Sequence, residues 1–201
     1  MSEALSPRRV VVGISGASGA IYGIRLVEVL AQIEGVEIHL VMSKGAEATI
    51  SYETDRTPGE IAGLAHVVHD ERNLAAAIAS GTFLTSAMVV APCSIRTLSA
   101  IANSANDNLL VRAADVHLKE RRSLVLVVRE TPLHLGHLRL MTDVTMSGAV
   151  ILPPVPGFYT LPKSIDDLVD HTVGKVLDTI GLTEHTLFDR WGGPKMTSET
   201  E

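Results

Sequence analysis

The sequence predicts a three-layer α/β fold of the Rossmann-like, flavodoxin-like kind, with helices on both faces of a doubly wound parallel sheet. Apolar runs rich in β-branched residues alternate along the chain with segments of helical periodicity. Apolar residues make up 46% of the 201 residues and aromatic residues only 3%, so Val, Leu, Ile and Ala must build the core. A glycine-rich loop directly follows the first apolar run. These features are typical of one domain with buried parallel strands.

The first two strands and their helices are predicted from the N-terminal fifth of the chain. Residues 10–14 form a continuous Val-rich run, which indicates a buried strand. Beyond the glycine loop, residues 21–30 carry apolar side chains on a broad helical face. Residues 37–42 are predicted as the second strand, and residues 43–44 open the next helix.

The middle of the chain begins with its least regular part. Residues 51–73 show no sustained period and are predicted to be an excursion from the core. Residues 87–91 form the third apolar run and end at a proline, which predicts a strand that stops there. Helices are then predicted at residues 94–103 and 108–121.

The C-terminal part continues the alternation. Strands are predicted at residues 124–128 and 149–152, with a helix between them at 135–146. The prolines within residues 153–157 predict a loop, because proline cannot donate to a strand ladder. Residues 164–180 carry apolar side chains at helical spacing and form the last predicted helix.

Domain organisation and location follow from composition. We expect an N-terminal extension at residues 1–8, one domain at 9–192 and a flexible polar tail at 193–201. The single cysteine, Cys93, excludes a disulfide framework, and no apolar stretch approaches the ~20 residues that cross a bilayer. The N-terminus lacks the features of a secretory signal, so a cytoplasmic protein without membrane contact is expected.

The charge balance argues against nucleic-acid binding. The chain has 17 basic and 23 acidic residues, and its net charge of −6 is opposite to the basic excess that binds phosphate backbones. Residues 112–129 are locally basic, with five Lys or Arg against two acids. On one helical face this pattern also fits a solvated stripe with an Asp115–Lys119 pair. Arg129 differs, because it ends a predicted strand beside Glu130, where a basic pocket suits a phosphate.

The glycine loop, residues 13–19, predicts a site for a phosphate-bearing ligand. It leads from a strand into a helix, so its backbone N–H groups and the helix dipole favour an anion. A simple tight turn is the alternative. The spacing G-x-x-G-x-x-G and the lack of an acid at the end of the second strand argue against a nicotinamide dinucleotide. Flavin mononucleotide, with one phosphate, fits better.

Several short motifs in their order and spacing resemble the UbiX-type flavin prenyltransferases, once described as aromatic-acid decarboxylases. The resemblance covers residues 9–191. Its motifs are Gly-Ala-Ser-Gly at 16–19, Ala-Pro-Cys-Ser at 91–94 with Thr-Leu at 97–98, Arg-Ala-Ala-Asp at 112–115, Leu-Lys-Glu-Arg-Arg at 118–122, Arg-Glu-Thr-Pro at 129–132, the run at 148–153, Pro-Gly-Phe-Tyr at 156–159 and Arg-Trp at 190–191.

The resemblance implies an enzyme that makes a cofactor. Such enzymes join the dimethylallyl group of dimethylallyl phosphate to N5 and C6 of reduced FMN, without a metal. The prenylated FMN serves a UbiD-type decarboxylase. Family members form homo-oligomers, often trimer-based and dodecameric, whose active sites are built across subunit contacts. The choice between the monophosphate and the diphosphate as donor stays open at this point.

The resemblance also implies roles for individual residues. FMN is expected to contact Gly16, Ala17, Ser18, Ser43, Ser94, Ile95, Arg96, Thr97 and Arg129. The prenyl phosphate is expected to meet Arg112, Lys119, Arg129, Tyr159 and Lys175. The expected catalytic group is Ser18, Glu53, Glu130 and Trp191. In this interpretation Glu130 is the acid/base and Ser18 orients the flavin N5 region. We expect one cavity to hold the flavin ring beside the clamped phosphate.

Four residues depart from the family pattern. Ile95 and Arg96 stand where smaller residues are common, which matters little if that turn binds through its backbone. Lys175 stands where some relatives have Arg, so the charge is kept and the bidentate fork is lost. Thr160 follows Tyr159 where His or Asn is frequent.

Other motifs have structural explanations that we prefer. Asp-Asp-Leu-Val-Asp at 166–170 matches a metal motif of all-helical isoprenyl diphosphate synthases, but Ser164 and the first two acids fit a helix cap. The His-x-x-His pairs at 66–69 and 134–137 lack a nearby third ligand, so no metal site is predicted. Cys93 has no neighbouring base and is interpreted as a packing residue.

Two rival functions stay open in the sequence. A cysteine-type flavoprotein decarboxylase would share the fold, but its P-A-S-A-N-T signature is replaced here by Asn-Ser-Ala-Asn-Asp-Asn at 103–108. A non-catalytic FMN carrier, or accessory subunit of an aromatic acid decarboxylase, would bind FMN and form no adduct from dimethylallyl phosphate.

Overall fold

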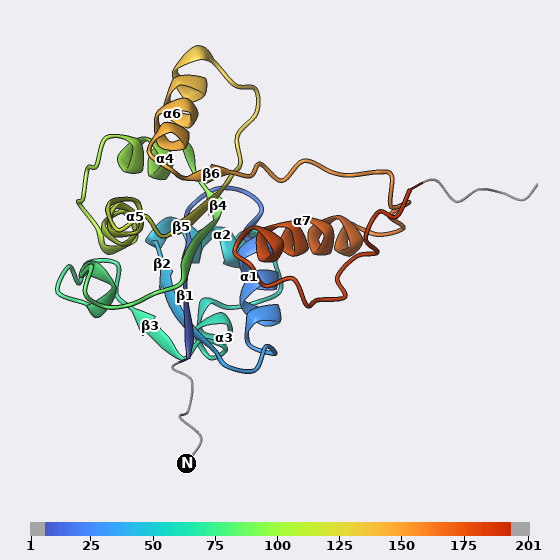
Figure 1. Ribbon diagram of the computed structural model, residues 1–201, viewed down its shortest axis with the longest axis horizontal. Coiled ribbons are helices and arrows are strands. Elements are labelled where there is room, and N and C mark those ends of the chain that lie inside the picture. The colour runs from blue at the N-terminus through green and yellow to red at the C-terminus, as the bar shows by residue number, and fades with distance from the viewer. Residues whose placement is uncertain (1–6, 194–201) are drawn as a thin grey trace, which may run out of the picture.

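Parallel strands form one sheet with helices on both faces in the computed structural model of the protein, which describes residues 7–193 (Figure 1). The predicted extension at 1–8 and tail at 193–201 therefore lie almost entirely outside the described residues. The strands are β1 (Arg8–Ile14), β2 (Val36–Met42), β3 (Val67–His69), β4 (Ala87–Cys93), β5 (Ser123–Val128) and β6 (Val150–Ile151). The helices are α1 (Ala20–Leu30), α2 (Lys44–Glu53), α3 (Pro58–Ala62), α4 (Ile95–Ala102), α5 (Leu109–Lys119), α6 (Leu135–Met146) and α7 (Ile165–Thr179), with a short 3₁₀ turn at Ala77–Ala79.

The strand order places a topological switch in the middle of the sheet. The order is β3-β2-β1-β4-β5-β6, and every pair is parallel. Val12 of β1 pairs with Leu40 of β2 on one side and with Val89 of β4 on the other. The chain thus winds outward from β1 in one direction and returns through β4 in the other. Ligands of such sheets bind beyond the carboxyl ends of the strands on either side of this switch.

Two apolar layers fill the space between the sheet and its helices. One layer packs α1, α2, α3 and α7 against the sheet and includes Ile24, Leu40 and Val173. The other packs α4, α5 and α6 against the opposite face and includes Leu98, Leu110 and Val144. The central strands are buried on both faces, as their continuous apolar runs predict. The predicted doubly wound fold is confirmed.

The interpretation of residues 51–73 as a mere excursion is wrong. This segment contains α3 and returns to the sheet as β3, which pairs with β2 from His39 to Val41. The strand has three residues at the sheet edge, and its Val67 and Val68 are 36% and 49% exposed. Such a short, half-exposed strand gives little of the apolar periodicity on which sequence prediction depends.

The end of β4 is fixed by a buried serine from the neighbouring loop. The strand continues past the predicted Ala91 to Cys93, with a shift of register after Val90. The Ser15 hydroxyl donates to the Pro92 carbonyl oxygen at 2.8 Å and accepts from the Ser94 N–H at 2.8 Å. Ser15 is 1% exposed. Since no water reaches these groups, the loops after β1 and β4 are held together by protein hydrogen bonds alone.

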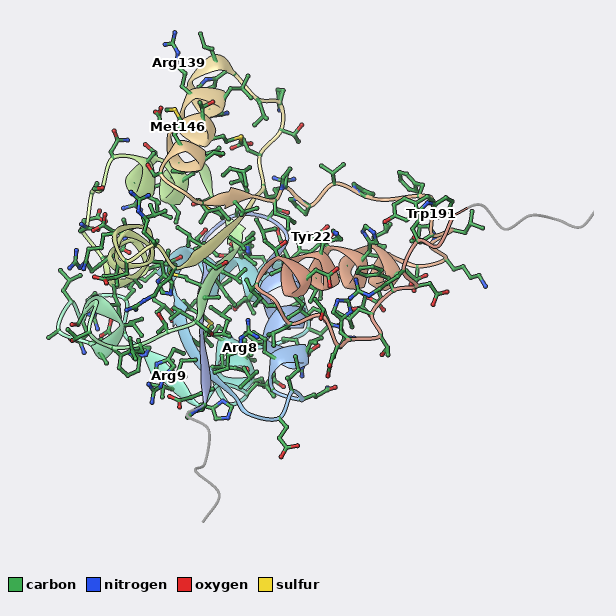
Figure 2. The ribbon with its side chains drawn as sticks, in the orientation of Figure 1. Arg8, Arg9, Tyr22, Arg139, Met146 and Trp191 are labelled. Carbon is green, nitrogen blue, oxygen red and sulfur yellow. The ribbon has the colours of Figure 1, made fainter. Side chains whose placement is uncertain are left out.

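Helix α6 packs against α4 and β6 and projects beyond the rest of the molecule. Figure 1 shows it projecting beyond the sheet, and Figure 2 shows Arg139 and Met146 along its outer surface. Val144 is its one buried residue, while Leu135, Leu138 and Met146 are exposed. Apolar side chains on a projecting helix are typical of a surface that contacts another molecule. None of the helices described within 7–193 has the length and apolar character needed to cross a bilayer.

We predict that Ser15→Ala lowers the free energy of unfolding by about 1–3 kcal/mol, because the buried Pro92 carbonyl loses a donor and the half-buried Ser94 N–H loses its acceptor. Urea denaturation followed by circular dichroism measures this loss. Ser51→Ala is the matched control, since the Ser51 hydroxyl donates only to the Glu47 carbonyl on an exposed helix face. Equal stability of both variants would contradict the role given to Ser15.

Candidate functional site

A cleft of about 670 Å³ lies at the carboxyl edge of the sheet, where the loops after β1, β2, β4 and β5 meet. It is lined by Gly16, Ser43, Lys44, Gly45, Glu71, Arg72, Ser94, Ile95, Arg96, Thr97, Ala100, Asp107, Asn108, Val111 and Glu130. This is the place that the strand order assigns to a ligand. The volume is of the size found for small-molecule and cofactor sites.

The glycine loop closes tightly on the start of α2. A Cβ on Gly16 would lie 2.9 Å from Cα of Gly45, and one on Gly45 would lie 3.1 Å from Cα of Gly16. The first distance is shorter than real Cβ atoms show and the second is tighter than most, so the close approach of the two backbones depends on glycine at position 16 and is favoured by glycine at position 45. The Ser43 N–H donates to the Ile14 carbonyl at 3.0 Å and ties these loops together. Backbone N–H groups therefore form this wall of the cleft.

Helix N-termini open into the cleft from three sides. Ser43 caps α2 by accepting from the Ala46 N–H at 3.1 Å, and Ser94 caps α4 by accepting from the Thr97 N–H at 3.2 Å. Asn108 caps α5 in the same way. The positive ends of three helix dipoles favour an anion here. Because Ile95 and Arg96 are in the first turn of α4, their backbone N–H groups can bind whatever their side chains are.

The cleft contains much of the set predicted for the flavin. It holds Gly16, Ser43, Ser94, Ile95, Arg96 and Thr97, together with Glu130 of the predicted catalytic group. Ala17 and Ser18 follow Gly16 in the same loop, and Arg129 precedes Glu130. The glycine cradle and the capped helix ends fit a ligand with one phosphate group, such as FMN. FMN requires no charged side chain at the phosphate when helix N-termini supply the donors.

Glu53 reaches from α2 to the start of α1. Its Oε2 accepts from the Gly19 N–H at 2.7 Å and from the Ala20 N–H at 3.3 Å, and so caps a helix that has no side-chain cap of its own. Desolvation raises the pKa of Glu53, but hydrogen bonds from the Ser18 hydroxyl and these N–H groups, with the charge of Arg129, lower it overall. Glu53 thus holds the glycine loop as an anion.

Arg129 faces the same loop from the end of β5. Its N–H donates to the Cys93 carbonyl at 3.1 Å, which continues the pairing of β5 with β4. Its charge also acts on Tyr22 of α1: burial raises the pKa of the phenol, and Arg129 partly offsets that rise. Arg129 therefore lies near both Glu53 and Tyr22, as a site residue beside the glycine loop would. Glu130, on the cleft side, accepts from the Thr131 N–H at 3.0 Å.

The C-terminal arm forms a second cavity of about 490 Å³. It is lined by Tyr159, Thr160, Leu161, Pro162, Lys163, Asp167, Leu187, Phe188, Asp189, Arg190, Trp191, Gly192 and Gly193. The rings of Tyr159 and Trp191 meet edge to face, with centroids 5.9 Å apart. Trp191 is held through Arg190, whose guanidinium donates to both carboxylate oxygens of Asp178 at 2.8 and 3.1 Å. Lys175 lies 4.0 Å from the same carboxylate.

The two cavities share no lining residue. We expected one cavity to hold the flavin beside the prenyl phosphate, but within one chain the residues predicted for the flavin and Tyr159 and Trp191 line different cavities. The segment after β6 leads Tyr159 away from the sheet edge. Figure 2 shows Tyr22 near the middle of the molecule and Trp191 far out on the C-terminal arm. A single cavity with both sets would need a second copy of the chain.

Arg112 and Lys119 are also outside the cleft. Arg112 donates to the Asp115 carboxylate at 3.0 Å and to the Ala79 carbonyl at 3.2 Å. Lys119 ends the 11-residue helix α5, so it lies about 16 Å from the helix end that lines the cleft. It pairs with Glu120. The Asp115–Lys119 pair considered as an alternative is therefore wrong, because Arg112 takes the Asp115 carboxylate.

Several cleft residues were missed by sequence reasoning. Glu71 and Arg72 line the cleft from the turn after β3, and the Lys44 N–H donates to Glu71 at 3.3 Å. The sequence feature that could have identified them is a run of charged residues directly after a strand. Since β3 was not predicted, this run was not recognised as a strand end. Asn108 stands at the start of the helix predicted at 108–121, but it was given no binding role, because its position at the sheet edge depends on the fold.

The structure shows the contacts of the motifs that we interpreted as structural. Ser164 and Asp167 form a capping box at the start of α7, and Asp170 pairs with Arg25. His66 accepts from the Ile38 N–H, and the ring of His69 bonds that of His39. Among residues 7–193, no group of three or more His, Cys, Asp or Glu is arranged to hold a metal ion. Cys93 is buried, and burial raises the pKa of its thiol far above the ordinary value.

Comparison with known proteins agrees with this architecture. The model of the Flavoprotein family matches residues 1–177. The flavin prenyltransferase UbiX of Thauera aromatica is 61% identical over 185 residues, which are 92% of this chain and 94% of that protein. The crystal structure of AnUbiX (PadA1) in complex with FMN and dimethylallyl pyrophosphate has a TM-score of 0.90 at 51% identity, over 94% of this chain and 100% of that one. A dodecameric FMN-dependent UbiX-like decarboxylase from Escherichia coli O157:H7 has a TM-score of 0.90 at 46% identity, over 92% of this chain and 100% of that one.

Glu53 gives the site a pH-dependent support. Its pKa is below 4.5 in the folded protein, so the ionised carboxylate adds stability above that pH, and this is lost as the pH falls through the folded value. We predict that Glu53→Gln is less stable than the parent at about pH 7 and that the difference is smaller at about pH 3, because the carboxylate of the folded protein takes up a proton as the pH falls. Urea denaturation at both values measures it, with the exposed Glu34→Gln as control. A difference that stays constant with pH would refute the capping role of the charge.

Proposed function

The chain belongs to the Flavoprotein family and, within it, to the UbiX flavin prenyltransferases, and from this we propose that it joins the dimethylallyl group of dimethylallyl phosphate to N5 and C6 of reduced FMN. The product is prenylated FMN. The observation that carries the proposal is the cleft built from the glycine loop and three capped helix ends, in a chain 61% identical to a flavin prenyltransferase.

FMN is held in this proposal at the carboxyl edge of the sheet. The backbone of residues 16–18, the Ser43 hydroxyl and the first turn of α4 receive the phosphate and ribityl chain. When bound and reduced, the flavin supplies the electron-rich N5 and C6 positions that accept the prenyl carbons. Ser18 is directed by its hydrogen bond to Glu53, so it orients the ring near N5. Arg129 stands beside the same loop and offsets negative charge on the ligands.

The prenyl phosphate is bound by donors from more than one copy of the chain. Arg129 and Glu130 come from the chain whose cleft holds FMN, whereas Tyr159, Lys175 and Trp191 come from the arm of a neighbour and Lys119 from a further surface. Three observations support this: the separation of the two cavities, the projecting α6 with exposed apolar residues, and the dodecameric relative. We propose a trimer-based, dodecameric assembly.

The residue chemistry suits cleavage of an allylic phosphate ester. When the C–O bond breaks, the phosphate carries away the bonding pair, and cationic donors stabilise that charge best where water is excluded. The Trp191 ring offers an electron-rich face to the positive dimethylallyl fragment. Formation of the new ring releases a proton, and the Glu130 carboxylate at the cleft wall is positioned to accept it. Glu53, already bonded to three donors, is less available for that task.

The product is proposed to serve a UbiD-type decarboxylase in the cytoplasm. The free, buried Cys93 fits a reducing compartment. The carrier hypothesis differs from the proposal in one respect, because a carrier would bind FMN without changing it. No observation favours it over an enzyme.

The proposal predicts that the protein, incubated anaerobically with reduced FMN and dimethylallyl phosphate, releases a flavin heavier by one isoprenyl unit. Mass spectrometry and absorbance of the released flavin measure the product, and a parallel sample with the diphosphate decides the donor. Bound but unmodified FMN with both donors would instead support the carrier.

Glu130→Gln is predicted to slow turnover by about 100-fold with FMN affinity unchanged, because the amide cannot take up the proton. Single-turnover rates and FMN titration separate the two effects. Glu34→Gln, on an exposed loop away from the cleft, is the control. Full turnover by Glu130→Gln would remove the acid/base role.

A further inference from the structure

The C-terminal arm, the loop after β6 and α7 are joined by a cluster of rings in a chain that has few aromatic residues. Tyr159 contacts Trp191 and His171 edge to face, at centroid distances of 5.9 and 5.6 Å. His171 in turn lies 5.0 Å from Phe188, which lies 5.3 Å from His185. His171 is thus the ring at the centre of the cluster, between Tyr159 and Phe188. Sequence analysis did not single it out.

A hydrogen bond directs the Tyr159 hydroxyl toward this buried histidine. The phenolic oxygen lies 2.9 Å from His171 Nε2. Tyr159 is 54% exposed, whereas His171 is 8% exposed and packed within α7. A rigid partner therefore holds a phenol that would otherwise rotate freely at the surface. Gly157 permits the contact, since a Cβ there would lie 3.1 Å from the His171 ring.

The state of His171 decides what the phenol can do. Burial lowers the pKa of His171, and the charge of Lys175, one helical turn further along, lowers it more. The ring is therefore neutral near pH 7 and carries one N–H. With that hydrogen on Nε2, the ring donates to the phenolic oxygen and leaves the phenolic proton free to donate outward. Lys175 then presents its ammonium group from the same helix face.

We propose that His171 is a positioning residue for the prenyl donor: it orients the Tyr159 hydroxyl so that the phenol donates to the donor phosphate beside Lys175. The assignment rests on the proposed function, because it gives a task to a tyrosine that the function places at the phosphate. His171 itself touches neither substrate. Its effect passes through one hydrogen bond, so removal of that bond must act on donor affinity and leave FMN affinity unchanged.

His171→Phe is the variant that tests this, because it keeps a ring of similar size among Tyr159 and Phe188 and removes the hydrogen-bonding atom. In oligomeric, FMN-loaded protein, we expect the dissociation constant of dimethylallyl phosphate to rise by about three- to tenfold, with KM rising in parallel and kcat changing less. Calorimetry on the oxidised holoprotein measures donor binding without turnover. His171→Gln, whose side-chain amide can still donate, should recover most of the affinity.

The double variant, His171→Phe with Tyr159→Phe, shows whether a loss of donor affinity comes from the lost orientation of the Tyr159 hydroxyl or from altered packing. Tyr159→Phe removes the phenolic oxygen, so adding His171→Phe to it should change donor affinity no further. His185→Gln is the matched control, since it removes a ring from the same cluster without touching Tyr159, and its amide can still donate to the Asp178 carboxylate that His185 contacts at 3.2 Å. Its donor affinity should stay within about twofold of the parent.

Three results would overturn the assignment: parental donor affinity in His171→Phe, additive losses in the double variant, or an equal loss in His185→Gln. If His171→Phe fails to fold, His171→Leu, which also lacks a hydrogen-bonding atom, gives the same comparison in the parent and in the Tyr159→Phe background. If the parent protein binds no donor, the proposed function is overturned as well. If the parent binds FMN and forms the adduct normally, any of the three results leaves the proposed function standing and overturns only the assignment to His171.

Discussion

The buried hydroxyl of Ser15 holds together the two strands between which the site forms. It donates to the carbonyl oxygen of Pro92 and accepts from the N–H of Ser94, so the loops after β1 and β4 share one fixed point. Ser15 lies within the glycine loop and Ser94 caps α4, so the wall of the cleft that these two segments form depends on this contact. Helix α1 also packs closely against β4 near this point, since a Cβ on Gly23 would lie 2.1 Å from the Ala91 carbonyl oxygen.

Three of the cationic residues predicted for the prenyl phosphate have acidic neighbours within the chain. Arg112 pairs with Asp115, Lys119 with Glu120, and Lys175 lies near Asp178, which is mainly engaged by Arg190. An incoming phosphate must compete with these carboxylates. The weakest contact is that of Lys175, at 4.0 Å, so its ammonium group is the most available of the three. Pairing also keeps the cations from repelling each other before substrate binds.

Sequence reasoning succeeded where the signal is local and long enough. Five strands were found because buried parallel strands leave continuous apolar runs, and the cap of α7 was found because Ser164 and Asp167 satisfy each other within four residues. It failed for β3, whose three residues are held by pairing with β2 and not by their own pattern. It also failed for the partner of Asp115, because Arg112 and Lys119 both lie within reach of that carboxylate on a helix, and only packing decides between them.

Residue order alone determined the doubly wound sheet, the glycine loop after the first strand and the family, since each depends on short motifs that can be recognised without coordinates. Tertiary structure decided which of those motifs meet. It brought Gly16 against Gly45 and Glu53 onto the start of α1, placed Glu71 and Arg72 in the cleft, and gave Tyr159 the partner His171. It also separated Tyr159 and Trp191 from the flavin cleft. These contacts join segments far apart in the chain, and their distances depend on how helices and loops pack, which no local pattern encodes.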